Sequence, residues 1–482
     1  MREKRRTHFN KRELTMEVAS MTKTIKAPIL FVAMLGFLTV LFSWSAPLLA
    51  QGTLQAIDPL ATSTDEYVHM DETFKQPSER VPLTKTFKDW LKETPSFFRD
   101  TKLNINLRTF DFYRDKFDNS KSEAWAIGGS ISYKSGYAFD RLALGATLYT
   151  SQPVGNQLES RDGTLLLEPG QSGYTVLGQA YAEIKVVDGV LIDLYRQEYN
   201  TPYINKHDVR MTPNTFEGYS IIGRHGGKDG APAFNWGGGY ITKIKEKNSD
   251  KFVWMSEDAG ADVNRGVFVG GANYAYKGFS VGAINYYSED IINIFYTEGK
   301  YTLPLKGPFG LGFAGQWAQQ NSTGDDLLTG SNFATNQFGV KGDASCSGVL
   351  VTLAYTQTAK GADMQNPWGG YPGYTSVQVQ DFNRAGETAF MTKVGYDFSK
   401  LGLQGVTAYA LWVHGWSAVS RTAGGSTYDQ DEYDFDLQWR PKMDLLKGLW
   451  FRARYAYIEQ RDSGHPTIND FRIIVNYDFS LL

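Results

Sequence analysis

Hydrophobic and polar residues alternate with a period of two through most of the chain after residue 101. Residues 103–108 read Leu-Asn-Ile-Asn-Leu-Arg, and similar alternation recurs in residues 433–440 and 471–479. Such alternation predicts β-strands with one apolar and one mostly polar face. Sustained 3.6-residue periodicity is missing, so crossover helices and a parallel sheet are not expected. The pattern therefore predicts an antiparallel all-β fold.

The runs number about eighteen, each of about ten residues, which is the length that a tilted strand needs to cross a bilayer. The strands are expected to start near Thr101, Glu123, Arg141, Gly173, Val190, Thr215, Ala233, Arg265, Phe279, Ile291, Phe309, Ala334, Ser347, Glu387, Leu403, Asp429, Leu449 and Asp470. We expect residues 101–482 to form a single transmembrane β-barrel.

The predicted connections tend to alternate between long and short. The long ones are residues 152–172, 200–214, 247–264, 320–333, 359–386 and 415–428, and short ones include residues 187–189, 277–278 and 343–346. Long extracellular loops and short periplasmic turns are typical of outer-membrane barrels. In a soluble β-sandwich, long and short connections are not expected to alternate in this way.

Aromatic residues also cluster near the predicted strand ends. They include Tyr286, Tyr287, Phe295, Tyr296, Trp412, Trp416, Tyr455 and Tyr457. Such clusters suit the aromatic girdles of a membrane barrel. The alternative is the aromatic core of a soluble β-protein, which the loop parity and the N-terminus disfavour.

The N-terminus resembles an export signal. Basic residues precede an apolar run at residues 29–42, and Pro47 and a plausible cleavage site after Ala50 follow. The run is shorter than the roughly 20 residues of a membrane-spanning helix. We therefore predict a signal peptide over residues 1–50 rather than an uncleaved anchor. Residues 51–100 are polar and interrupted by prolines, and are expected to be a periplasmic extension.

The start of translation is left open by the sequence. The candidates are Met1, Met16 and Met21.

Charge and cysteine content narrow the choice of partners. Without residues 1–50, which hold eight Lys/Arg and three Asp/Glu, the chain has 49 − 8 = 41 basic and 52 − 3 = 49 acidic residues. The resulting net charge of −8 argues against nucleic acid. Cys346 is the single cysteine, so an internal disulfide is excluded. A membrane barrel of this kind would have outer-membrane lipid as a partner.

Arginines occupy the polar phase of several predicted strands. Arg452 and Arg454 alternate with apolar residues in residues 449–459. An arginine facing lipid at mid-membrane costs roughly 2–4 kcal/mol, so both are expected to face the lumen. The same phase argument turns Arg472, Arg108 and Arg114 inward, and barrel closure would bring these strands together.

Two interpretations of these arginines stay open. They could form a basic track along which a carboxylate moves between guanidinium groups. They could instead be neutralised by wall carboxylates such as Asp434, Asp436 and Asp478.

Catalytic and metal sites are not indicated. The six histidines are scattered without ligand spacing, and no phosphate loop, zinc helix or nucleophile elbow occurs. A barrel hydrolase would need a Ser–His pair on the outer wall, for which His414 beside Trp412 and Trp416 is the nearest candidate. We predict no enzyme activity and no cofactor.

Residues 199–218 contain two prolines, several Asn and Thr residues, and a charged group at Lys206, His207, Asp208 and Arg210. Strand-like runs lie on both sides, so this segment is expected to be an ordered connection that folds into the bore.

At these residues the chain resembles the OprD-type outer-membrane porin family, over about residues 96–482. The resemblance is carried by residues 103–115, 123–128, 135–136, 200–218 and 447–456, notably Asn-Thr-Pro, Asp-x-Arg and Pro-Asn-Thr-Phe-Glu-Gly in the fourth segment. It implies an eighteen-stranded barrel with one pore per chain, an inward constriction loop, and passive uptake of small carboxylate-bearing nutrients along an arginine ladder. Whether barrels assemble into trimers is left open.

The resemblance also implies roles for individual residues. The ladder members would be Arg108, Arg114, Arg452, Arg454 and Arg472, with Arg210 near the narrowing. The constriction loop would contribute Tyr203, Asn205, His207 and Asp208. One departure is the ending Phe-Ser-Leu-Leu in place of a terminal aromatic residue. The alternative to a porin is a structural or surface-binding barrel with a plugged lumen.

Overall fold

The computed structural model describes residues 90–227, 230–305, 307–419, 427–461 and 464–482. The predicted signal peptide, residues 1–50, and residues 51–89 of the predicted extension lie outside these described residues. The last part of that extension contains the short helix α5 (Ser96–Arg99), which leads into the first strand.

Nineteen strands form one antiparallel sheet in the described residues. They are β1 (Lys102–Asp115), β2 (Lys121–Lys134), β3 (Leu142–Pro153), β4 (Tyr174–Val187), β5 (Val190–Gln197), β6 (Thr215–Gly226), β7 (Ala233–Lys245), β8 (Val253–Trp254), β9 (Val267–Tyr276), β10 (Phe279–Ser288), β11 (Ile292–Leu303), β12 (Phe309–Asn321), β13 (Ala334–Cys346), β14 (Val349–Thr358), β15 (Thr388–Asp397), β16 (Val406–Trp416), β17 (Gln430–Trp439), β18 (Leu449–Gln460) and β19 (Thr467–Ser480). Other short helices in the described residues include α6 (Met255–Asp258), η1 (Glu159–Arg161), η3 (Phe398–Leu401) and η4 (Asp444–Leu446).

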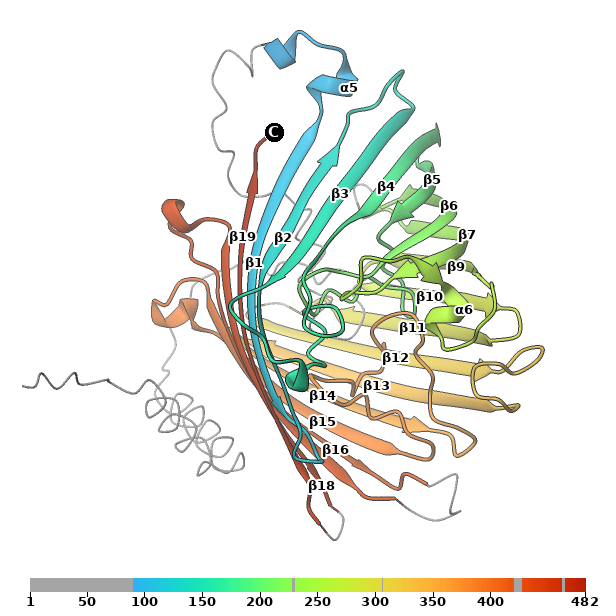
Figure 1. The fold of residues 1–482 in the computed structure, drawn as a ribbon, viewed down its shortest axis with the longest axis vertical. Helices are drawn as coiled ribbons and strands as arrows, with labels where there is room; N and C mark the ends of the chain where they lie inside the picture. The colour runs from blue at the N-terminus through green and yellow to red at the C-terminus, as the bar shows by residue number, and fades with distance from the viewer. Residues whose placement is uncertain (1–89, 228–229, 306, 420–426, 462–463) are drawn as a thin grey trace, which may run out of the picture. The chain divides into compact units, whose positions relative to one another are not determined.

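The sheet closes on itself because β1 pairs with both β2 and β19. In the closing pair, Arg108 lies opposite Asn476 and Phe112 lies opposite Arg472. Each remaining long strand pairs with the long strands before and after it, whereas the two-residue β8 pairs only with β7, among the described residues. The eighteen long strands therefore make a closed antiparallel barrel (Figure 1), and the predicted fold is confirmed.

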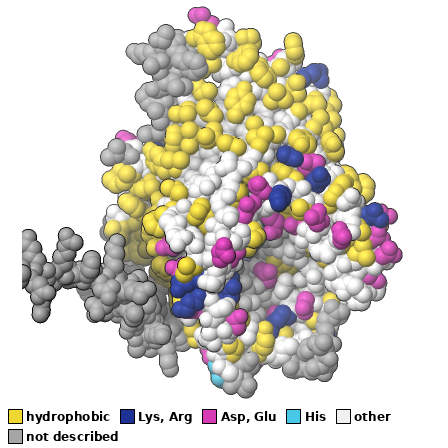
Figure 2. Space-filling model, viewed as in Figure 1, with side chains coloured by type: hydrophobic (Ala, Val, Ile, Leu, Met, Phe, Trp, Pro, Cys, Tyr) yellow, Lys and Arg dark blue, Asp and Glu magenta, His cyan; other side chains and the backbone are white. Residues whose placement is uncertain are grey.

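Side chains alternate between the two faces of the wall. In β1, Leu107 is 52% exposed, whereas Phe110 and Phe112 are buried inside the barrel. Figure 2 shows hydrophobic side chains covering much of the wall on one side of the molecule, with acidic and basic side chains gathered towards another part. A wall with an apolar outer face is what a bilayer requires, because only a closed barrel leaves no strand edge exposed to lipid.

The long connections lie at one end of the barrel, as predicted. Residues 154–173, 198–214, 246–266, 322–333 and 359–387 all join strands at one end of the barrel. The shortest connections, the two-residue turns at residues 188–189, 277–278 and 347–348, lie at the other end, where both chain termini of the barrel lie. In one of these turns, Lys277 and Gly278 have φ values of 47° and 81°, the left-handed pair that suits a tight hairpin. The long-loop end is the extracellular end of such a barrel.

The largest apolar cluster lies inside the barrel rather than between layers of sheet. It joins inward side chains of β6, β7 and β9–β12 to residues of the long loops. Trp368, in residues 359–387, is fully buried there, and its Nε1 donates to the Met255 carbonyl at 2.8 Å. Several long loops are therefore packed into the bore.

Candidate functional site: the divided interior of the barrel

Residues 198–214, which connect β5 to β6, are the predicted constriction loop, and they pack inside the barrel. Tyr203 is fully buried, and its ring meets those of Tyr286, Tyr296 and Tyr371 edge-on, with centroids 5.9, 6.2 and 6.1 Å away. Its backbone N–H donates to the Tyr286 hydroxyl at 3.2 Å. Tyr203 therefore anchors the constriction loop to the wall and does not line the cavities described below.

Asn205 joins the constriction loop to a second inward loop, residues 359–387, which we call the long loop. Its side-chain amide donates to the Gly370 carbonyl at 3.0 Å, and its amide oxygen accepts from the Gly370 N–H at 2.8 Å. Asn205 is 1% exposed. Like Tyr203, it holds the constriction in place instead of lining a cavity.

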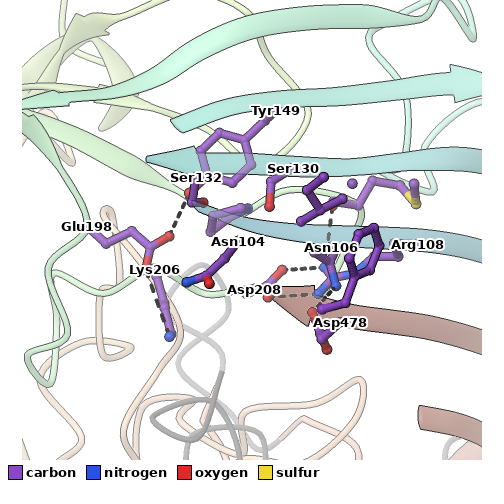
Figure 3. Close-up of a pocket in the computed structure, with 15 residues that line it drawn as sticks. Asn104, Asn106, Arg108, Ser130, Ser132, Tyr149, Glu198, Lys206, Asp208 and Asp478 are labelled. Carbon is purple, nitrogen blue, oxygen red and sulfur yellow. Dashed lines mark hydrogen bonds and ion pairs between the residues drawn. The ribbon is translucent and has the colours of Figure 1, made fainter. Parts of the chain in front are cut away.

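Asp208 links the constriction loop to the barrel wall through Arg108 (Figure 3). The two Nη atoms of Arg108 lie 2.5 and 3.0 Å from the two carboxylate oxygens of Asp208. The Nε of Arg108 donates to Asn476 on β19 at 2.7 Å. This bidentate pair is the strong, directional kind of charge-assisted hydrogen bond. The structure thus brings together two residues that the sequence placed on the loop and the wall.

His207 and Arg210 lie on the other face of the same short segment, where both line the larger cavity. Arg210 is 8% exposed, and its Nε donates to the Thr164 carbonyl at 2.7 Å. His207 has a φ of 36°, a left-handed conformation that non-glycine residues seldom adopt. The backbone is thus turned sharply where the loop narrows the bore.

The predicted ladder arginines lie on neighbouring strands, on a surface that we call the basic wall: the inward faces of β17, β18, β19 and β1. Register places Asp436 beside Arg454, Arg454 beside Arg472, and Arg472 beside Phe112. Arg452, Arg454 and Arg472 are 5%, 4% and 2% exposed and point away from lipid. Their inward orientation and the closure of β19 on β1 agree with the phase argument made from the sequence.

One carboxylate serves both arginines of β18. An oxygen of Asp436 lies 2.7 Å from the Nε of Arg452 and 3.0 Å from the Nε of Arg454. Asp436 is 1% exposed. The predicted neutralising role of Asp436 is therefore visible in the geometry, although it balances only one of the two positive charges.

The other two suggested wall carboxylates also lie near arginines: Asp478 attracts Arg108, and Asp434 attracts Arg454 and Arg472. Asp478 accepts from the neutral amide of Asn106 at 2.7 Å. Asp434 accepts a backbone N–H from Gln378 of the long loop at 3.1 Å. The direct ion pairs of Arg472 and Arg114 are made with Asp470, which has an oxygen 2.7 Å from each Nε.

Phe112 lies among three guanidinium groups on the basic wall. The guanidinium carbons of Arg210, Arg472 and Arg114 lie 5.1, 5.1 and 5.3 Å from the centre of its ring. A cation above an aromatic face gains about 0.5–2 kcal/mol. The ring of Phe112 therefore helps to stabilise the three positive charges around it.

The long loop is fastened to the basic wall by its own backbone. Consecutive N–H groups of Gln378, Val379 and Gln380 donate to Asp434 and Glu432 of β17 at 3.1, 2.8 and 2.8 Å. The Gln378 side chain donates to Asp470 at 2.8 Å, and its carbonyl accepts from Arg472 at 3.1 Å. Acidic side chains of β17 thus position the long loop.

The larger cavity, which we call the outer cavity, has a volume of about 430 Å³. Its cationic lining consists of Arg114, Arg210, Arg454, Arg472, Lys247, Lys341 and Lys393. Its acidic lining consists of Asp343, Asp381 and Asp434. Seven cationic side chains against three acidic ones give the lining an excess of positive charge, which Asp436 and Asp470 behind it partly offset.

Two loop residues of the outer cavity have shifted proton affinities. Burial lowers the pKa of Lys247, and the nearby Arg210 acts in the same direction. Burial also raises the pKa of Asp381. The first shift weakens the positive charge of the cavity and the second weakens its negative charge, so the two effects oppose each other.

The smaller cavity, which we call the inner recess, has a volume of about 70 Å³ and lies on the opposite face of the constriction loop. Its charged lining consists of Arg108, Lys206, Glu198, Asp208 and Asp478 (Figure 3). Asn104 and Phe479, near the two ends of the barrel sequence, also line it, so it lies on the side of the termini and the short turns.

The six arginines that were predicted to line the channel thus lie in different environments. Arg114, Arg210, Arg454 and Arg472 line the outer cavity, and Arg108 lines the inner recess. Arg452 faces inward but lines neither of these cavities.

Sequence reasoning missed Asp470 and the lysines Lys341 and Lys393 of the outer cavity. Period-two spacing could have found Asp470, because it lies two residues before Arg472 on the same face. The lysines occupy inward positions of β13 and β15, where Lys341 lies over Tyr374 and Lys393 over Tyr409.

His414 does not belong to the interior site. Its ring stacks between Trp412 and Trp416, and its Nδ1 lies 3.0 Å from a carboxylate oxygen of Asp431. Among the described residues, no serine hydroxyl forms a hydrogen bond with His414. A Ser–His pair, which the hydrolase hypothesis required, is therefore not formed in the described part of the chain.

The closed barrel, the apolar outer wall and the charged, loop-narrowed interior define an outer-membrane porin. The model of the OprD family of outer membrane porins matches residues 95–481, and the chain belongs to this family. Members of this family are passive channels for small solutes in the outer membrane of Gram-negative bacteria, and not enzymes.

Individual relatives agree with this assignment. Porin D of Pseudomonas aeruginosa is 21% identical over 434 residues, covering 84% of this chain and 96% of that protein. Among solved structures, OccK9 (OpdG) of P. aeruginosa is 23% identical with a TM-score of 0.71, covering 80% of this chain and 100% of that one. OccAB1 of Acinetobacter baumannii is 18% identical with a TM-score of 0.70, covering 81% and 99%. These structures share the fold of the chain.

Proposed function

We propose that this porin is a passive, substrate-selective diffusion channel for small carboxylate-bearing or zwitterionic solutes. The arginines Arg108, Arg114, Arg210, Arg452, Arg454 and Arg472 would guide the solute, and the constriction loop with Tyr203, Asn205, His207 and Asp208 would set the width. The observation that carries the proposal is the gathering of four of these arginines around one cavity with few acidic side chains.

Guanidinium chemistry explains how such a wall could pass a carboxylate along. Each guanidinium has five N–H donors, whereas one carboxylate takes two of them in a bidentate contact. A solute carboxylate could therefore bind an arginine that already has a protein partner and step to the next. Partial neutralisation by Asp436 and Asp470 would keep each step weak enough for release.

A relative offers support of the same kind. A solved structure of OpdK from P. aeruginosa, 20% identical with a TM-score of 0.68, covers 80% of this chain and 100% of that one and is described with vanillate. Vanillate carries a carboxylate. By the same proposal, residues 1–50 are a signal peptide, residues 51–100 a periplasmic extension and residues 101–482 the barrel, with one pore per chain.

Replacing the arginines of β18 tests the proposal. In planar bilayers, Arg452→Ala with Arg454→Ala should lower the anion preference, and in liposomes it should lower carboxylate uptake, because two positive charges leave the basic wall. A matched control, Arg99→Ala with Arg141→Ala, removes two exposed arginines away from the outer cavity and should change neither.

The double variant leaves Asp436 buried without these partners, which could impair folding. A triple variant that adds Asp436→Asn removes this strain and keeps the test decisive. Unchanged selectivity in a folded variant would refute the arginine assignment. A wild-type barrel without conductance would instead favour the plugged, surface-binding alternative.

A further inference from the structure

The long loop crosses the basic wall at a place where the arginine column of β18 is interrupted. The inward positions of β18 hold Arg452, then Arg454, and then Ala456, which is fully buried. Register places Ala456 directly between Asp434 of β17 and Asp470 of β19. Because the side chain of alanine is a single methyl group, the wall has a gap here, bordered by two carboxylates and lying next to the arginines.

Gln378 of the long loop spans this gap. Its N–H donates to Asp434 at 3.1 Å, its side-chain amide donates to Asp470 at 2.8 Å, and its carbonyl accepts from Arg472 at 3.1 Å. The next residue, Val379, packs against the apolar cluster that contains Ala456. Gln378 therefore connects β17 to β19 across β18, at the point where the wall itself lacks a polar side chain.

The contact with Gln378 limits access to arginines that the proposed function uses. Arg454 and Arg472 line the outer cavity, but they are only 4% and 2% exposed. The Gln378 carbonyl takes a hydrogen bond from an Nη of Arg472. This N–H group is one of the donors that a solute carboxylate would need for a bidentate contact. Gln378 thus occupies the position of a solute oxygen.

We propose that Gln378 is a specificity-determining residue of this channel: its carbonyl is an internal ligand of Arg472, and a solute reaches Arg472 and Arg454 by taking its place. The inference rests on the proposed function, because it requires that these arginines contact the solute. It adds the condition that the solute must bind a guanidinium group well enough to displace the long loop.

The chemistry of the exchange favours carboxylates over simple anions. A carboxylate is charged and binds a guanidinium group through two oxygens, whereas the Gln378 carbonyl is neutral and offers one. The amide oxygen of Gln378 is buried and has no hydrogen-bond partner among the described residues, which makes its docked position less favourable. The hydrogen bonds of Gln378 to Asp434 and Asp470 oppose displacement. Chloride, which has no second oxygen to contribute, should therefore displace the loop less readily.

Two variants disturb this contact from opposite sides. Ala456→Leu places a larger side chain in the gap and should displace Gln378, whereas Gln378→Ala removes the side-chain amide that holds Asp470. Reversal potentials in planar bilayers, with chloride on one side and butanoate on the other, give the ratio of the two permeabilities. In both variants the butanoate-to-chloride ratio should fall several-fold, because chloride then reaches the arginines without having to displace the loop.

Each variant has a matched control. Ala453→Leu makes the same substitution on the lipid-facing side of β18, opposite Leu437. Gln365→Ala removes another glutamine side chain of the long loop, whose amide donates to the Asp363 carbonyl of the same loop. Both controls should keep the wild-type ratio. If overpacking prevents Ala456→Leu from folding, Gln378→Ala, which introduces no steric overlap, still decides the question.

The outcomes separate this inference from the proposed function. A wild-type butanoate-to-chloride ratio in folded Gln378→Ala would overturn the role of Gln378. If the variant with both β18 arginines replaced still loses anion preference, the proposed function stands without it. Unchanged selectivity in that folded arginine variant would instead overturn the proposed function, and the role of Gln378 with it.

Discussion

The two halves of the barrel wall face the same bore with opposite chemistry. On β10–β12 the inward side chains include Tyr286, Ile294, Tyr296 and Ala318, which pack into one apolar cluster and are at most 3% exposed. On β17–β19 and β1 the inward positions hold the acidic and basic residues of the basic wall. One half of the wall therefore holds loops by burying apolar surface, and the other half holds them by hydrogen bonds to charged groups.

This difference shows where a passage can lie. On the apolar half the loops pack closely against buried side chains of the wall. On the basic wall they are fastened at separate polar points such as Gln378, and the outer cavity remains between them. The outer cavity thus lies beside the basic wall.

The largest effect is expected on the apolar half, from Trp368→Ala. Trp368 is fully buried between loops, and truncating a buried tryptophan typically costs about 3–5 kcal/mol. We expect the long loop to loosen, single-channel conductance to rise and carboxylate selectivity to fall. Trp90→Ala, at a tryptophan that is 56% exposed, should leave both unchanged in planar bilayers. Unaltered conductance in the Trp368 variant would show that the apolar cluster does not set the width.

On the basic wall, Asp470→Asn should change the width of the bore less than Trp368→Ala does. It should, however, clearly change the charge of the wall. The change keeps a hydrogen-bonding side chain of the same size while removing the negative charge between Arg114 and Arg472. The anion-to-cation permeability ratio should rise, and the free energy of unfolding should fall by up to about 3–5 kcal/mol.

Reversal potentials in a salt gradient and denaturant titrations measure the two effects of this change. Asp115→Asn, at a carboxylate 35% exposed beside Lys121, is the control and should alter neither. A permeability ratio that stays constant in the Asp470 variant would argue that the basic wall does not govern selectivity.

The smallest expected effect is a pH dependence in the loop between β7 and β9. Burial, with help from Glu246, raises the pKa of Asp258 to about 8. Because the folded loop then binds a proton that the unfolded chain releases near pH 4, stability is full below that value and falls as pH rises towards 8. Hydrogen exchange of residues 255–261 should show this loss in the wild type and not in Asp258→Asn. Equal pH profiles in the two proteins would contradict it.

Much of the fold could be predicted because each strand carries its own signal. The expected starts agree with the observed strands to within about three residues, as with Thr101 for Lys102 and Leu403 for Val406. The exception is β8 (Val253–Trp254), which is too short to produce a periodic pattern. Local alternation thus identifies strands, but not a two-residue pairing made by a folded loop.

The site could be predicted only in part, because contacts between distant segments leave no local signal. The inward direction of Arg452 and Arg454 follows from alternation within one strand. The pairing of Arg114 with Asp470 instead depends on the register of closure between β1 and β19. The docking of Gln378 on β17 depends on the path of the long loop, which has no periodicity. Strand faces are encoded locally, whereas loop positions are decided by tertiary packing.

The paired hydrogen bonds between Asn205 and Gly370 have a mechanical consequence. They join the constriction loop and the long loop, which lie far apart in the sequence, into one unit. A force on either loop is therefore transmitted to the other. A molecule too wide for the opening would then have to displace both loops and their shared apolar packing together. We therefore expect permeation to stop sharply above a limiting solute size, and not to decline gradually as solutes become larger.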